Sequence, residues 1–299
     1  MINGVINIFK EKGYTSADVV ARLRGILHQK KIGHTGTLDP AAEGVLPVCL
    51  GNATGLVESL TDHDKEYVCT CRLGVTTDTE DMTGTVLSRS DVRLAEEEVR
   101  LAAESFLGAY LQVPPMYSAL KQNGRRLYEL AREGIEVERK PRALRITELE
   151  ILGTELPLFR FRVVCSRGTY IRSLCRDIGE KLGCGAAMEE LLRSRSGEFA
   201  LDGALRLEEV EKLAAEGAME EHVLPVEHFY RECKCLTVKA EEMRLLENGN
   251  PLPAAAFSEE IEAKDGERFR VCDAEGRFRA LYVYEAGKER FKAERMYLT

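Results

Sequence analysis

Two segments that alternate between apolar and polar residues constrain the fold more than any other feature of this sequence. In residues 65–73, a tyrosine, two cysteines and a leucine occupy every second position. Residues 159–165 repeat the pattern, with arginines at two of the intervening positions. A period of two places the apolar side chains on one face of an extended chain. Each segment is therefore predicted to be a strand with one buried face.

Other segments carry apolar residues at helical spacing. The predicted helices cover residues 17–29, 94–107, 125–132, 171–182 and 207–216. They do not alternate regularly with the strands, as they would in a doubly wound parallel sheet. The pattern therefore favours the α+β class.

The chain changes character near residues 224–225, where Leu-Pro opens a linker-like stretch. Beyond it lie one short predicted helix at 240–247 and strand-like segments at 268–272 and 279–284. Roughly 65 residues of this kind suit a small β-barrel. We therefore predict two domains, residues 1–230 and residues 231–299.

Composition excludes several classes of protein. With 44% hydrophobic and 31% charged residues, the chain is expected to be globular. No apolar run approaches the roughly 18 residues of a membrane span, and the first residues do not resemble a signal peptide, so the cytoplasm is expected. Nine scattered cysteines do not form a disulfide framework. Two C-x-C pairs lack further ligands at zinc spacing, so no metal site is predicted.

The formal net charge of −8 argues against a nucleic-acid partner, because phosphate binding relies on Lys and Arg. The distribution of charge weakens this objection. Residues 158–176 contain five arginines and no acidic residue. Residues 22–34 likewise contain arginines and lysines but no acidic residue. A basic surface on an acidic protein is therefore compatible with the sequence.

The segment Gly-His-Thr-Gly-Thr-Leu-Asp-Pro at residues 33–40 is the most unusual in the chain. Pro40 disfavours a helical conformation at Asp39, which places the carboxylate on a turn. Asp39 is either an ordinary residue of an Asp-Pro turn or a functional carboxylate.

A second segment, residues 165–172, leads from a strand through Gly168 into a helix. Arg172 lies at the start of that helix, where the macrodipole favours acidic residues, so a specific anionic partner is expected. Asp39 is one candidate. Asp177 or Glu180, farther along the same helix, are the alternatives.

A third segment, residues 112–128, combines paired prolines and small residues with aromatic residues next to arginines. Such a loop suits contacts with an RNA backbone and stacked bases. It would equally suit binding of another protein.

Together these segments resemble the TruB family of tRNA pseudouridine-55 synthases. Five motifs carry the resemblance, in order and at the usual separations: GHTGTLDPAAEGVLPVCLG, KEYVCTCRLGVTTDTEDMTG, QVPPMYSALKQNGRRLYELAREG, CSRGTYIRSLCRDIGEKLGCGA and LLRSRSGEF. It covers residues 2–230, and the tail, with residues 245–249, is more weakly similar to a PUA domain. One departure is that Lys10 is followed by Glu11, where the family has proline.

The resemblance implies the pseudouridine synthase fold, a mixed and largely antiparallel sheet flanked by helices, with a small PUA-like β-barrel. The implied reaction isomerises uridine to pseudouridine in the T-loop of tRNA, by flipping the base out and without cofactor or metal. Residues 112–141 would clamp the RNA. No obligate protein partner is implied, and a monomer is expected.

By the same matching, Asp39 is the nucleophile, Arg172 pairs with it, and Tyr67 stacks on the base and takes part in proton transfer. Without the family, Tyr67 would be read as a core residue. Implied substrate contacts fall on His34, Tyr170, Leu191, Lys10, Arg126, Arg139 and Lys140. Two other functions remain open, a non-catalytic tRNA-binding and folding chaperone and a guide-RNA-dependent synthase.

Overall fold

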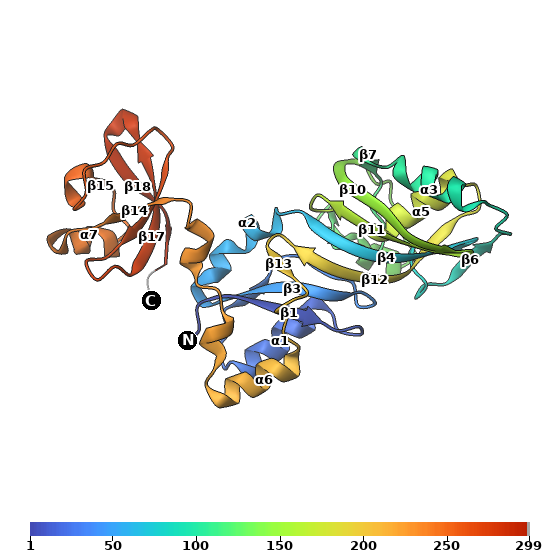
Figure 1. The fold of residues 1–299 in the computed structure, drawn as a ribbon, viewed down its shortest axis with the longest axis horizontal. Helices are drawn as coiled ribbons and strands as arrows, with labels where there is room; N and C mark the ends of the chain where they lie inside the picture. Colours follow the sequence, from blue (N-terminus) through green and yellow to red (C-terminus); the bar gives the residue numbers. More distant parts are fainter. Residues whose placement is uncertain (298–299) are drawn as a thin grey trace.

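The computed structural model describes residues 1–297, which form a large lobe and a small C-terminal lobe (Figure 1). One nine-stranded sheet organises the large lobe, in the order β1-β3-β12-β4-β11-β10-β7, with β2 paired to β3 and β13 to β12. Its strands are β1 (Gly4–Lys10), β2 (Ile32–His34), β3 (Glu43–Leu50), β4 (Lys65–Leu73), β7 (Gly108–Gln112), β10 (Arg142–Glu155), β11 (Leu158–Cys165), β12 (Ala186–Ser196) and β13 (Phe199–Ala200).

Neighbouring strands of this sheet are antiparallel except for β3 and β12, which run parallel. The predicted strand at residues 65–73 is confirmed as β4, whose residues alternate between buried and half-buried. It lies between β11 and β12. This mixed, largely antiparallel sheet with flanking helices is the predicted α+β architecture.

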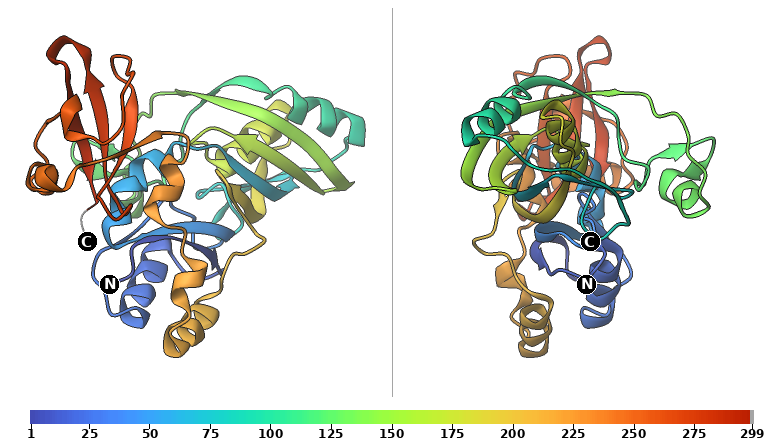
Figure 2. Two further views of the ribbon diagram at one scale, coloured as in Figure 1. Left: turned by 60° about the vertical axis from the view of Figure 1, so that its left-hand side comes forward. Right: turned by 90° about the vertical axis from the view of Figure 1, so that its right-hand side faces the viewer.

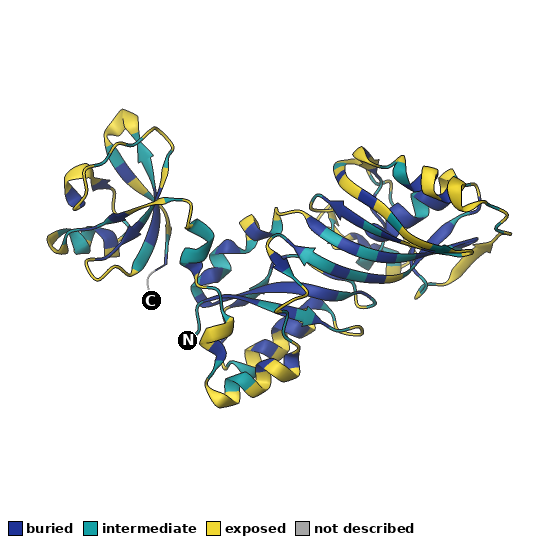
Figure 3. Cartoon of the chain, viewed as in Figure 1, coloured by how far each residue is buried: buried dark blue, intermediate teal, exposed yellow. Residues whose placement is uncertain are grey.

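Helices pack on the sheet in two groups (Figure 1). Helices α1 (Ser16–Ile26) and α6 (Leu207–Glu216) cover β1 and β3, and their apolar residues share one core with those strands. Helices α3 (Glu96–Glu104) and α5 (Ile171–Lys181) share a second core with β4, β11 and β12. The outer faces of α3 and α6 remain exposed, whereas β3 is buried along nearly its whole length (Figure 3).

Shorter elements connect these layers. They are α2 (Val57–Thr61), a hairpin of β5 (Val75–Thr77) and β6 (Val86–Arg89), a hairpin of β8 (Lys121–Gln122) and β9 (Arg125–Arg126), and α4 (Leu127–Arg132). Short 3-10 turns occur at residues 51–56, 219–222 and 226–230 of this lobe. Among the described residues, none of the helices has the length and apolar character needed to cross a membrane.

The C-terminal lobe contains a curled five-stranded sheet with a core of its own (Figure 1). Its strands are β14 (Lys234–Thr237), β15 (Leu252–Pro253), β16 (Arg268–Cys272), β17 (Phe278–Glu285) and β18 (Arg290–Met296), and α7 (Met243–Glu247) is its helix. Several contacts join it to the large lobe. The hydroxyls of Tyr230 and Tyr297 lie 2.6 Å apart, Asn52 Nδ2 donates to the carbonyl of Tyr297 at 3.2 Å, and Arg270 pairs with Glu227 at 2.7 Å.

Sequence patterns located the helices well. Thr15 caps α1 and forms a capping box with Asp18, and α6 ends at Gly217 in the left-handed conformation. Residues 125–126, predicted as helix, are instead strand β9, because the helix begins only at Leu127. The strands β1, β3, β10 and β12 were not predicted. A strand buried on both faces, such as β3, lacks the alternation that reveals a half-buried one.

Gly44 permits the parallel contact between β3 and β12. It pairs with Arg193, has a φ of +112°, and a Cβ added there would lie 2.2 Å from the Arg193 carbonyl oxygen. We expect Gly44→Ala to lower the free energy of unfolding by about 3 kcal/mol, because backbone strain and overpacking each cost about 1–3 kcal/mol.

Urea unfolding of the two proteins measures this difference. Gly25→Ala is the matched control, since the added carbon lies inside α1 with nothing within 4 Å and should leave stability unchanged or slightly raised. Equal stability of Gly44→Ala and wild type would show that β3 can shift away from β12 without cost.

Candidate active site

Asp39 lies in the loop between β2 and β3. Hydrogen bonds from the segment before α1 and from its first residue hold this loop: the N–H of Leu38 donates to Ser16 Oγ at 2.9 Å, and the N–H of Gly13 donates to the carbonyl of Pro40 at 2.8 Å. The Asp39 side chain is 37% exposed. Its carboxylate is therefore fixed at the backbone but open to solvent.

Arg172, the second residue of α5, contacts this carboxylate with two nitrogens. Nε donates to Asp39 Oδ2 at 2.9 Å, and Nη2 donates to Oδ1 at 3.2 Å. The arginine side chain is only 4% exposed. Of the anionic partners considered for Arg172, the structure places Asp39 there, whereas Asp177 contacts Arg176.

Two backbone carbonyls complete the coordination of the Arg172 guanidinium. Nη1 donates to Thr79 and Nη2 to Tyr117, each at 2.9 Å. A second carboxylate, that of Asp81, lies 3.8 Å from Nε and is nearly buried. Asp81 was not predicted as a site residue, although it lies in the TTDTEDMTG motif, because nothing in the spacing of that motif singles out one of its acids.

Asp81 is held in turn by short hydrogen bonds. Its Oδ1 accepts from Thr79 Oγ1 at 2.8 Å and from the N–H of Thr83 at 2.9 Å. These bonds satisfy the oxygen that faces away from Arg172. The loop after β5 therefore supplies a fixed negative charge behind the Asp39–Arg172 pair.

An apolar wall lies beside the pair. Tyr67 of β4 and Leu191 of β12 are 8% and 7% exposed, and both belong to the core cluster that contains Leu38, the neighbour of Asp39. Burial raises the pKa of Tyr67, while the positive charge of Arg193 acts in the opposite direction. Tyr67 is thus a buried core residue on whose phenol the charge of Asp39 acts.

Tyr170 lies at the N-terminal end of α5 and is bonded to Gln112, the last residue of β7. Its N–H donates to Gln112 Oε1, and its carbonyl accepts from Gln112 Nε2, both at 2.9 Å. Burial raises the pKa of the Tyr170 phenol, and the positive charge of Arg172 opposes that rise. The start of the predicted clamp is therefore anchored at the site.

Lys10 and His34, both predicted to contact the substrate, lie nearer the protein interior than Asp39 does. Lys10 is fully buried, and its Nζ donates to the carbonyls of Glu11 and Tyr14 at 3.1 and 2.7 Å. Burial lowers the pKa of Lys10 to about 8, and the charge of Asp39 acts against this shift. His34 is half-buried, its Nδ1 accepts from the N–H of Gly36 at 3.3 Å, and burial lowers its pKa.

The remaining predicted contacts lie on the segment 112–141, which projects from the large lobe (Figure 2). Arg126 and Lys140 are exposed, and the guanidinium of Arg126 lies 5.8 Å from the ring centre of Tyr128. Arg139 is more enclosed and donates to the carbonyl of Pro114 at 3.1 Å. These three residues do not lie next to Asp39. They lie on residues 112–141, a limb whose first residue, Gln112, contacts Tyr170 at the site.

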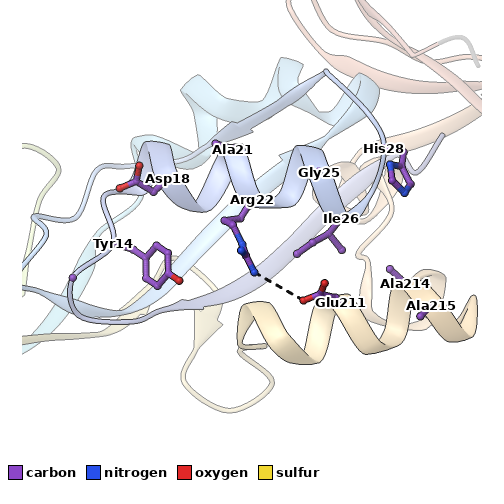
Figure 4. Close-up of a pocket in the computed structure, with 11 residues that line it drawn as sticks. Tyr14, Asp18, Ala21, Arg22, Gly25, Ile26, His28, Glu211, Ala214 and Ala215 are labelled. Atoms are coloured by element: carbon purple, nitrogen blue, oxygen red, sulfur yellow. Dashed lines mark ion pairs between the residues drawn. The ribbon is translucent and has the colours of Figure 1, made fainter.

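A separate hollow of about 940 Å³ lies between α1 and α6 (Figure 4). An ion pair of 3.9 Å between Arg22 and Glu211 crosses it. None of the predicted site residues lines this hollow. Among residues 1–297, no group of three or more His, Cys, Asp or Glu side chains is arranged to hold a metal ion.

Comparison with known proteins places this geometry in a family. Residues 24–171 match the N-terminal domain of TruB family pseudouridylate synthase, and residues 172–230 match the tRNA pseudouridylate synthase B C-terminal domain. A tRNA pseudouridine synthase B of Lachnoclostridium phytofermentans is 48% identical over 99% of this chain and 100% of the relative. One from Bacillus pumilus is 42% identical over 97% of this chain and 95% of the relative.

Solved structures show the same fold. A chain of a Cbf5-Nop10-Gar1 complex matches with a TM-score of 0.70 and 28% identity, covering 99% of this chain and 85% of that chain. A chain of an H/ACA RNP bound to a substrate RNA containing 2′-deoxyuridine matches with a TM-score of 0.69 and 26% identity, over the same shares. With family matches across residues 24–230 and a relative 48% identical over nearly its full length, the chain belongs to the TruB family of tRNA pseudouridine synthases, which are isomerases.

Proposed function

We propose that this enzyme converts the uridine at position 55, in the T-loop of tRNA, to pseudouridine, with Asp39 as the nucleophile. The observation that carries the proposal is the exposed carboxylate of Asp39 held by two nitrogens of the buried Arg172. A charged guanidinium stabilises the ionised form of a neighbouring carboxylate, which is the form that acts as a nucleophile. The partial exposure of Asp39 leaves this charge accessible to a nucleoside.

The reaction moves a base from one bond to another. The bond between N1 of uracil and C1′ of ribose breaks, the base turns while still bound, and C5 joins C1′. The same atoms are present at the start and at the end, so the chain's own residues have to hold the base and move protons. Tyr67 and Leu191 offer an apolar surface against which a uracil released from its ribose can pack.

Tyr67 is proposed to move the proton. Its phenol gives a proton to N1, which loses its bond to the sugar, and the phenolate then takes the proton from C5. The electron pair of the C5–H bond restores the ring, and Tyr67 ends as it began. Its position among residues that neighbour Asp39 supports this role.

Binding of tRNA is assigned to two surfaces. The limb of residues 112–141 carries exposed arginines next to Tyr128, a combination suited to backbone phosphates and unstacked bases. The C-terminal lobe, residues 231–299, is proposed to be a PUA-like RNA-binding domain. Extruding the target uridine costs a few kcal/mol, which these contacts would offset. We propose that the enzyme acts as a monomer in the cytoplasm.

A guide-RNA-dependent synthase is the second candidate, favoured by the similarity to a chain of an H/ACA RNP bound to a substrate RNA. The relatives named tRNA pseudouridine synthase B are more similar in sequence, at 42–48% identity against 26–28%. The stand-alone activity is therefore the better supported of the two. A non-catalytic chaperone would not need the Asp39–Arg172 pair.

Asp39→Asn removes the charge and keeps the shape of the side chain. We expect no measurable pseudouridine from a uridine-containing tRNA transcript, because an amide is not a nucleophile, while tRNA binding persists. Product analysis of the digested RNA and a filter-binding assay measure the two properties. Asp202→Asn, at an exposed position of the same lobe, serves as control and should retain full activity. Equal product from both variants would remove Asp39 from the mechanism.

Arg172→Lys tests the geometry of the pair rather than its charge. A lysine cannot reproduce two donors to Asp39 together with bonds to the carbonyls of Thr79 and Tyr117. We expect the single-turnover rate to fall by about 100-fold, because a misplaced catalytic group costs about that factor. An unchanged rate with normal circular dichroism would show that any cation suffices there.

The position of the target is tested with a T-arm stem-loop and with full-length tRNA transcripts, in which the uridine at position 55 is present or replaced by cytidine. We expect modification at position 55 in both uridine-containing RNAs, without guide RNA or protein partner. Mapping of the modified position by carbodiimide-dependent reverse-transcription stops gives the readout. Modification elsewhere, or only after addition of a guide RNA, would reject the T-loop assignment.

A further inference from the structure

Arg193 of β12 is the most unusual buried side chain of the large lobe. It is 1% exposed and is among the largest fully buried residues. Among the residues that the structure describes, no carboxylate lies within ion-pair distance of its guanidinium, whereas Arg195 two positions later has Glu66 at 3.7 Å. Burying a charge without a counterion is costly, so an arginine at this position calls for a role that an apolar residue could not fill.

Its contacts are with the backbone of the Asp39 loop and the strand that follows it. Nε donates to the carbonyl of Val45 at 2.7 Å, and Nη2 donates to the carbonyl of Gly36 at 3.2 Å. Gly36 is three residues before Asp39, and Val45 lies in β3. Arg193 therefore fixes both ends of the segment that carries the nucleophile.

Arg193 also lies directly across the sheet from Tyr67. Arg193 and Tyr67 are directly opposed in the antiparallel pairing of β12 and β4, so their side chains leave the sheet on the same face. Directly opposed residues have Cβ atoms about 5 Å apart. The positive charge of Arg193 acts against the rise in the pKa of Tyr67 that burial causes.

Other charged groups share this part of the protein. Lys10 from β1, His34 from β2 and Lys65 from β4 all have pKa values lowered first by burial, with Arg193 adding to the effect, and those of Lys10 and Lys65 fall to about 8. Asp39 and the thiol of Cys165 on β11 act on Tyr67 with the opposite sign. Arginine alone keeps its charge throughout this range, so Arg193 is the permanent cation of the group.

We propose that Arg193 is a positioning residue of the isomerisation: it holds the Asp39 loop through Gly36 and Val45, and it stabilises the negative charge that develops on the Tyr67 oxygen. The inference rests on the proposed function, since it requires Tyr67 to give its proton to N1 and to accept the proton of C5. No additional reactant enters. Arg193 acts through Tyr67 and the loop rather than on the substrate itself.

The test compares single-turnover conversion of tRNA transcripts whose uridines carry hydrogen or deuterium at C5. We expect Arg193→Gln to lower the rate by about 100-fold, within the range that general acid–base catalysis contributes. Without the cation the Tyr67 phenol is a weaker acid, so its proton transfer to N1 should become limiting. The isotope effect at C5 should therefore fall below that of wild type, and the solvent deuterium isotope effect should grow. Arg195→Gln, on the same strand but half-exposed, is the matched control and should behave as wild type.

Arg193→Lys covers the case in which Arg193→Gln does not fold. A buried lysine loses its charge as pH rises, whereas arginine does not, so this variant should approach the wild-type rate near pH 7 and lose activity toward pH 9. Wild type should show no such loss over that interval.

Two results would overturn the inference. One is a slower Arg193→Gln whose C5 and solvent isotope effects match wild type, which would leave Arg193 a structural role alone. The other is a wild-type rate for Arg193→Gln. A full rate for Tyr67→Phe would instead overturn the role proposed for Tyr67, and product from Asp39→Asn would overturn the role of Asp39, so the failures are distinguishable.

Discussion

The contact of two Arg172 nitrogens with the Asp39 carboxylate is the interaction on which the site depends. A guanidinium that is 4% exposed has lost most of its water and needs anionic and carbonyl partners to replace it. It finds them in three loops: the one after β2, the one after β5 and the one after β7. One buried side chain therefore joins segments that are far apart along the chain. Breaking its contact with Asp39 would leave the buried charge with only the more distant carboxylate of Asp81.

The sheet decides which residues surround that pair. β4 lies between β11 and β12, and β12 crosses beside β3 in the one parallel pairing of this sheet. This crossing brings Tyr67 and Leu191 next to the loop that precedes β3. Gly44 makes it possible, because any side chain there would meet the backbone of β12. The packing of β3 against β12 therefore also determines the geometry of the site.

The site has two chemically different sides. Toward solvent lie the open Asp39 carboxylate and the exposed arginines of residues 112–141. The arginines suit a polyanionic partner, even though the net charge of the protein is −8. Toward the interior lie buried cations, Lys10, Lys65 and Arg193, whose nitrogens donate to backbone carbonyls. The exposed arginines can attract RNA. The inner cations hold loops, and Arg193 also acts on the phenol of Tyr67.

The sequence by itself determined the half-buried strand β4, the helices α1, α5 and α6, and, through its motifs, the family and the prediction that Arg172 meets Asp39. It determined them because alternation, capping residues and motif order are local properties of the chain. Only the tertiary structure decided that β3 and β12 are neighbouring parallel strands, that Lys10 points into the interior, and that Asp81 and Arg193 stand behind the site. Those features depend on which distant segments pack together, and a residue such as Arg193 carries no local mark of its burial. Hydrogen bonds between distant strands and loops fix the positions of those residues. Such contacts cannot be inferred from the spacing of residues along the sequence.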